Sequence, residues 1–127
     1  MIYIVDTHGL VWFLDQPERL GTSARSILTD PESALVVPTI VLAEIRYLAA
    51  SRRITPTFDA VLRVILDDPR FDVFPLDGTV VELMPLSLNI HDAIVVSTAL
   101  ALADADDVTV VTRDREITES GVVRTIW

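Results

Sequence analysis

The chain has 127 residues, half of them hydrophobic, which is the size of one domain with a sizeable core. It contains no cysteine, so disulfides, thiolate metal sites and thiol catalysis are excluded. The formal net charge of -9 argues against a general nucleic-acid-binding domain, which would carry a basic stripe.

The basic residues and the apolar stretches narrow the class of protein further. All ten basic residues are arginines, whose planar guanidinium suits bidentate contact with phosphate, so a local cationic rim is compatible with an acidic whole. Met1 leads directly into an apolar run without a basic region, so we expect no signal peptide. The longest apolar stretches are shorter than the roughly 20 residues of a membrane span. We therefore expect a single cytoplasmic domain, residues 1–127, that does not contact a membrane.

The first half of the chain alternates between short apolar runs and helical patterns. The run at 2–5 is typical of a strand buried on both faces, and Asp6 follows it directly. Helical patterns then extend from 9 to 15 and from 22 to 29, and Pro17 and Pro31 end them. A second strand is predicted at 34–37, followed by a helix at 39–50.

The second half continues the same alternation. We predict a helix over 55–66, a strand over 71–76, a short helix over 78–84, a helix over 90–102, and strands over 108–112 and 122–126. An acidic loop at 104–107 is expected to be solvated. The alternation predicts a three-layer α/β fold with a mainly parallel sheet of four to five strands.

The helix at 90–102 is apolar on every side, which predicts that it lies in the core. Asp92 is the only charged residue within it. On its own, this acid is best interpreted as a group stabilised by the helix dipole in the first turn. A metal ion shared with other acids is the alternative, and it requires those acids to converge.

Convergence is what the predicted topology favours. Open α/β sheets place their sites outside the carboxyl ends of the strands, where Asp6 and Asp114 are expected. Glu44 lies early in the helix after the second strand, and Asp92 at the amino end of the core helix. Carboxylates gathered this closely cannot all stay ionised unless a cation neutralises them. Oxygen ligands select a hard ion, so Mg²⁺ or Mn²⁺ is the expected occupant.

Four short motifs carry a resemblance to a known family. They are Val-Asp-Thr-His at 5–8 followed by Trp12, Leu-Ala-Glu-Ile at 42–45, His-Asp-Ala-Ile at 91–94 leading to Thr-Ala-Leu at 98–100, and Val-Thr-Arg-Asp at 111–114. None is specific alone, but the ordered set resembles the successive motifs of PIN-domain ribonucleases, and most closely the VapC-type toxins of toxin–antitoxin pairs.

The resemblance implies a three-layer α/β/α PIN-like fold and a metal-dependent endoribonuclease. It implies that Asp6, Glu44, Asp92 and Asp114 form an acidic quartet that holds Mg²⁺, with Thr112 as a polar helper. It also implies an RNA substrate, a cognate antitoxin partner and a homodimer. The candidate RNA-contacting arginines are Arg46, Arg52, Arg53, Arg113 and Arg115, although a solvated surface position is at least as good an interpretation of each.

Two other classes of protein were weighed. A phosphotransfer or signalling domain also places an aspartate after its first strand. The active sites of such domains need a lysine as well, and this chain has none. A catalytically silent interaction module, whose acids only cap helices, remains the main alternative. His8 and His91 are interpreted as packing or capping groups, and Trp12 and Phe13 as either core residues or a partner-binding patch.

Overall fold

The computed structural model describes all residues from 1 to 127 and contains one five-stranded sheet. All neighbouring strands are parallel, in the order β3-β2-β1-β4-β5. The strands are β1 (Ile2–Val5), β2 (Ala34–Pro38), β3 (Phe71–Phe74), β4 (Val108–Val111) and β5 (Thr125–Ile126). The predicted three-layer fold with a parallel sheet is confirmed.

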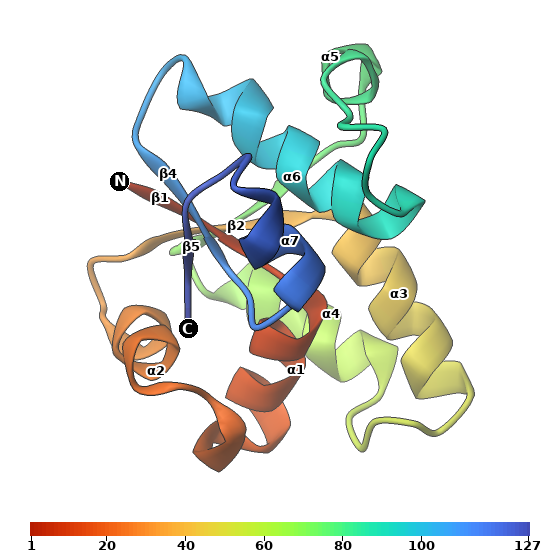
Figure 1. Cartoon of the computed structure of the whole chain (residues 1–127). Coiled ribbons are helices and arrows are strands. Elements are labelled where there is room, and N and C mark those ends of the chain that lie inside the picture. The colour runs from red at the N-terminus through yellow and green to blue at the C-terminus, as the bar shows by residue number, and fades with distance from the viewer.

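Seven α-helices surround this sheet. They are α1 (Thr7–Asp15), α2 (Thr22–Thr29), α3 (Thr39–Ala50), α4 (Phe58–Asp67), α5 (Gly78–Glu82), α6 (Ile90–Ala103) and α7 (Arg115–Ser120), with one 3₁₀ turn, η1 (Pro17–Arg19). Helices α5 and α6 lie on one face of the sheet, and α1 and α2 on the other (Figure 1). No helix combines the length and the apolar character that crossing a bilayer requires.

The core lies between these layers and around β1. Ile4 and Val5 of β1 are fully buried, as the continuous apolar run predicts for a central parallel strand. Helix α6 is buried at every position from 92 to 99. The hydroxyls of Ser97 and Thr98 donate to the carbonyl oxygen of Ile94, so these polar side chains stay satisfied inside the core.

Several element boundaries differ from the predictions for local reasons. Helix α1 begins at Thr7 because the Asp6 carboxylate caps it, and α4 begins at Phe58 because Thr57 caps it. Strand β3 ends at Phe74 before Pro75, and the last strand contains only residues 125 and 126.

Helix α7 was not predicted, although the sequence holds both of its end signals. Asp114 caps its amino end, and Gly121 ends it in the left-handed conformation, with φ of 66°. Six residues, of which only Ile117 is buried, give too weak an apolar pattern to mark a helix. Because of this helix, Asp114 occupies a fixed cap position instead of a free loop.

A candidate active site at the carboxyl edge of the sheet

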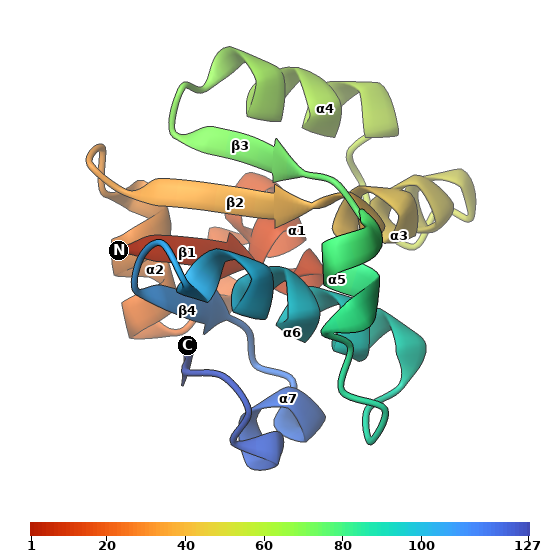
Figure 2. The ribbon, with the colours of Figure 1, turned by 90° about the horizontal axis from the view of Figure 1, so that it is seen from above.

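The strand order places a crevice between β1 and β4. The chain adds β2 and β3 on one side of β1, then returns to add β4 and β5 on the other, so the connections diverge at this point. In Figure 2 the strand arrows point to the side where α6 begins. Val5 is paired with Val111, so Asp6 and Thr112 come directly after matched positions. The Thr112 Oγ1 atom donates to Asp6 Oδ2 over 2.8 Å.

Asp6 is held from several directions at once. Its side chain is buried, and its Oδ1 atom accepts from the backbone N–H of Thr7 at 2.8 Å. The same oxygen lies 3.6 Å from Nε2 of His91. Burial would raise the pKa of this carboxyl, but the hydrogen bonds from His91, Thr112 and Thr7 outweigh it and hold the pKa below its ordinary value. Asp6 is therefore ionised at neutral pH.

Glu44 is joined to Asp6 by shared partners. The Thr7 hydroxyl donates to Glu44 Oε2 at 2.8 Å, and His91 Nε2 lies 2.9 Å from the same oxygen. The hydrogen bond with His91, more than any other contact, holds the pKa of Glu44 below its ordinary value.

His91 is the cation between these two acids. Its hydrogen bonds with Asp6 and Glu44 outweigh the cost of burial and raise its pKa to about 10. The prediction that this histidine only packs or caps a helix missed the ion pairs. The available signal was its position in the first turn of α6, at the same edge as the acids, in a chain with 19 acids and ten arginines.

Asp92 lies on the other side of the crevice and is also buried. Asn89 caps α6, accepts from the Asp92 backbone N–H at 3.0 Å and donates to Asp92 Oδ2 at 2.6 Å. Burial raises the pKa of Asp92, and the negative charges of Asp114 and Asp6 raise it further. Asp92 is therefore close enough to both Asp114 and Asp6 to be repelled by each.

Asp114 is positioned through its backbone and through its carboxylate. Its N–H donates to Thr112 Oγ1 at 3.0 Å, and its Oδ1 accepts from the N–H of Ile117 at 3.1 Å. A small polar cavity of about 140 Å³ lies here without a hydrophobic residue in its lining, which is Asp6, His8, Gly9, Thr112, Arg113 and Asp114.

The chemistry of the acids suits a hard divalent cation. The side chains as they stand do not bring three carboxylate or imidazole groups within metal-binding distance of one another. The candidate ligands nevertheless offer only carboxylate oxygens, and the repulsion that raises the pKa of Asp92 is what a cation would relieve. Asp6, Asp92 and Asp114 are the residues that could share it, while Glu44 is the acid nearer to His91, at 2.9 Å against 3.6 Å for Asp6.

The candidate arginines do not gather around the acids. Only Arg113 lines the acidic cavity, and it also lies over the ring of Trp12 at 5.0 Å. Arg46 lies over Phe58, and Arg115 pairs with Glu119 at 3.3 Å. Arg52 and Arg53 line a separate groove between α1 and the loop after α3.

The aromatic residues near the cavity are mostly internal. Trp12 is only 7% exposed, so it belongs to the core and not to an open patch. Its ring packs against His8 at 5.3 Å and against Trp127 at 5.7 Å between ring centres.

Helix capping accounts for two of the four acids. Asp6 and Asp114 do cap α1 and α7. Glu44, however, lies inside α3, and the Asp92 carboxylate is bound by the Asn89 side chain, which is itself the cap of α6. A buried Asp92 that two neighbouring acids repel needs an explanation beyond capping.

The parallel sheet, its strand order and this acidic edge define an α/β/α domain with a charged site at its switch point. The PIN-domain family model matches residues 3–121, so the chain belongs to the PIN-domain family. No curated protein matches it in sequence.

Solved structures show the same fold. The chain is similar to one in a complex of VapBC2 from Rickettsia felis bound to a promoter DNA fragment, with a TM-score of 0.72, 17% identity, and coverage of 100% of this chain and 99% of that one. It is also similar to a chain of FitAcB from Neisseria gonorrhoeae, with a TM-score of 0.70, 18% identity and coverage of 100% and 97%. A toxin–antitoxin complex from Klebsiella pneumoniae gives a TM-score of 0.65, 18% identity and coverage of 98% and 96%.

Proposed function

We propose that this PIN-domain chain is a metal-dependent endoribonuclease that acts as the toxin of a cytoplasmic toxin–antitoxin pair. The observation that carries the proposal is the set of acids at the switch point between β1 and β4, where Asp6 and Asp92 are buried and where burial and the charges of Asp114 and Asp6 raise the pKa of Asp92. The family membership supports a nuclease, and the similar solved structures, which include toxin–antitoxin complexes, support the toxin role.

In this proposal the acids supply negative charge for the metal ion, and Thr112 positions two of them. Asp6, Asp92 and Asp114 would hold Mg²⁺ or Mn²⁺, with Glu44 as the fourth acid of the site. A cation bound there would supply an acidified water and positive charge opposite the RNA phosphate. Thr112 fixes the orientation of Asp6 through its 2.8 Å hydrogen bond and of Asp114 through the backbone. By analogy with two-metal nucleases, we expect products with 5′-phosphate and 3′-hydroxyl ends.

Asp92→Asn tests the metal and the catalysis together. Burial and neighbouring acids raise the pKa of Asp92, so its ionised form destabilises the folded protein at neutral pH. We expect the variant to melt at a higher temperature than the wild type without divalent ions. Mg²⁺ should raise the melting temperature of the wild type more than that of the variant. The variant should not cleave RNA, and the wild type should lose RNA cleavage when EDTA is added.

Two results of that experiment would contradict two separate parts of the proposal. Unchanged melting of the wild type in millimolar Mg²⁺ or Mn²⁺ would contradict the shared metal. Equal RNA cleavage by the wild type in Mg²⁺ and in EDTA would contradict metal-dependent catalysis.

A cognate antitoxin would silence the toxin by covering the acidic crevice and neighbouring apolar helices. The similarity of this chain to one in a toxin–antitoxin complex from Klebsiella pneumoniae supports such a partner. Co-expression with the protein encoded by the adjacent reading frame should restore growth and yield a stable complex.

We further propose a homodimer formed through exposed apolar residues in the segment that runs from the end of α5 to the first residue of α6. Leu83 is 40% exposed, Leu86 92% and Ile90 73%, in a region close to Asp92. Exposed apolar side chains gathered in this way are typical of an interface. Leu86→Glu should convert the dimer to a monomer in sedimentation, while Leu66→Glu, on the exposed face of α4, should not. A monomeric wild type would refute the dimer.

A further inference from the structure

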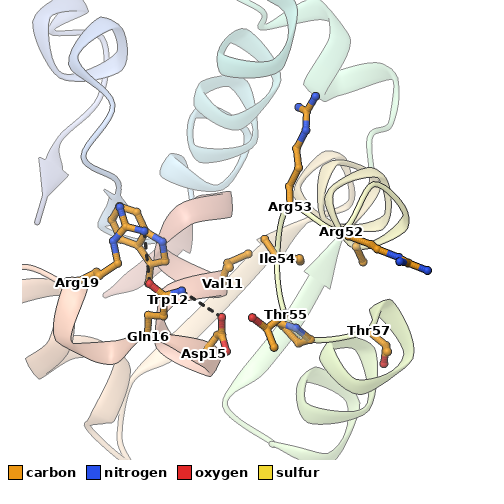
Figure 3. A pocket seen from close by; sticks show the side chains of 12 residues that line it. Val11, Trp12, Asp15, Gln16, Arg19, Arg52, Arg53, Ile54, Thr55 and Thr57 are labelled. Carbon is orange, nitrogen blue, oxygen red and sulfur yellow. Dashed lines mark hydrogen bonds between the residues drawn. The ribbon is translucent and has the colours of Figure 1, made fainter.

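A second and larger cavity lies beside the acidic site. Its volume is about 560 Å³, and it separates α1 with the turn after it from the loop between α3 and α4 (Figure 3). Trp12 and Arg19 lie on the first wall, and Arg53, Ile54 and Thr55 on the second. We call this cavity the α1 groove.

The charge of the α1 groove is opposite to that of the whole chain. Three arginines, Arg19, Arg52 and Arg53, line it against a single acid, Asp15, although the chain carries a net charge of -9. The side chains of Arg52 and Arg53 make no ion pair or hydrogen bond within the protein. Positive charge left without an internal partner at a hollow surface favours an anionic ligand.

The two walls present their cations differently. Arg19 lies over the Trp12 ring, 4.2 Å from its centre, and donates weakly to Gln16 Oε1 at 3.4 Å. In Figure 3, Arg19 lies against Trp12 on one side of the groove and Arg53 lies on the other, while Arg52 points away from α1. Arg19 and Arg53 are therefore the two cations on opposite walls of the groove.

The backbone of the second wall is strained. Arg52 has φ of 58°, the left-handed conformation that usually belongs to glycine after a helix. The N–H of Arg52 donates to Ala49 and that of Arg53 to Leu48, which closes the end of α3. This turn directs the next residues, Arg53 and Ile54, toward the groove.

The α1 groove is connected to the acids through Trp12. Arg19 lies over the Trp12 ring at 4.2 Å and Arg113 at 5.0 Å, and Arg113 also lines the acidic cavity. Asp6 precedes the first residue of α1, while Asp15, its last residue, lines the groove. The nine residues of α1 span ~13 Å, so one extended ligand could contact both the acidic site and the α1 groove.

We propose that the α1 groove holds the stretch of single-stranded RNA next to the cleaved phosphate. Arg19 and Arg53 would contact backbone phosphates, and the apolar atoms of the half-buried Ile54 would contact a base. This inference rests on the proposed ribonuclease function. The α1 groove would explain how a strongly acidic protein binds a polyanion, because Arg19 and Arg53 concentrate positive charge along this groove.

The test measures RNA binding and cleavage separately. Binding of labelled single-stranded RNA of about 4 to 16 nucleotides would be measured by anisotropy in an Asp6→Asn background with Mg²⁺. Arg53→Gln and Arg19→Gln should each weaken binding by roughly 5- to 10-fold and reduce the salt slope by about 0.7 per lost contact. In the cleavage-competent chain the same changes should raise KM more than they lower kcat.

Arg124→Gln is the matched control. Arg124 is an exposed arginine beside Asp106, Asp107 and Val108, at the amino end of β4 and therefore at the opposite edge of the sheet from the acids. It should bind RNA like its parent. Because the Arg53 side chain makes no hydrogen bond or ion pair within the protein, its replacement should leave thermal melting unchanged, which separates lost binding from lost folding.

The possible outcomes distinguish failure of the groove proposal from failure of the proposed ribonuclease function. If the wild type cleaves RNA while Arg53→Gln and Arg19→Gln bind RNA like Arg124→Gln, the groove proposal is overturned and the ribonuclease stands. If these variants instead lose only antitoxin binding, the groove holds a protein and the proposal is equally overturned. If the wild type neither binds nor cleaves RNA, the proposed function fails first.

Discussion

Asp6→Asn is expected to reduce RNA cleavage on the order of 100- to 1,000-fold and to abolish growth arrest on expression. Asp6 is the most tightly constrained acid of the site, with contacts from Thr7, His91 and Thr112. The neutral amide would keep the size of the side chain and remove its charge. Initial cleavage rates on a defined RNA in Mg²⁺ and growth of the expressing cells would measure the effect.

Asp72→Asn provides the control for that experiment. Asp72 lies exposed on the edge strand β3 and has no contact with the crevice. Its replacement removes the same charge from the chain and should leave cleavage unchanged. Full activity of Asp6→Asn, with the Asp72→Asn variant equally active, would remove Asp6 from the catalytic site.

A loss of folding stability between about pH 6.5 and pH 10 is expected in the metal-free protein and is assigned to His91. The ion pairs with Asp6 and Glu44 raise the pKa of His91 to about 10 from its ordinary 6.5. Its stabilisation is thus complete below pH 6.5 and disappears as the pH rises through 10. Because the side chain is 26% exposed, we expect a contribution on the order of 1 to 3 kcal/mol.

Urea unfolding of the wild type and His91→Gln across this pH range would measure that contribution. The variant should be less stable at pH 6.5 and should approach the wild type near pH 10. His8→Gln serves as the control because His8, although it lines the acidic cavity, packs against Trp12 and makes no ion pair or hydrogen bond with the acids. Parallel pH profiles for the wild type and His91→Gln would contradict the assignment to His91.

Most of the fold could be predicted because its signals are local and strong. Buried parallel strands are continuous apolar runs, as in Ile4 and Val5, and the core helix α6 is apolar on every side. The predictions failed where a single side chain decides a boundary. Thr57 delays the start of α4, and Asp114 with Gly121 defines a helix too short to show periodicity.

The candidate site was predictable in location but not in detail. The position of Asp6 after β1 and of Asp114 after β4 follows from general rules for parallel sheets. The bridge from His91 to Asp6 and Glu44 depends on side-chain orientation across 85 and 47 residues, which no local pattern encodes. The α1 groove likewise depends on how the loop after α3 turns toward Trp12. Whether the acids converge on one metal ion stays a prediction.

The pairing of β1 with β4 also sets when the acidic edge can assemble during synthesis. Asp6 and its Thr112 partner are separated by 106 residues, so their hydrogen bond forms only after the intervening chain has been made. At synthesis rates of about 5 to 20 residues per second, this separation corresponds to roughly 5 to 20 seconds. Under the proposed function, a partial chain that ends before β4 lacks the complete site, and a newly synthesised antitoxin has that interval in which to bind.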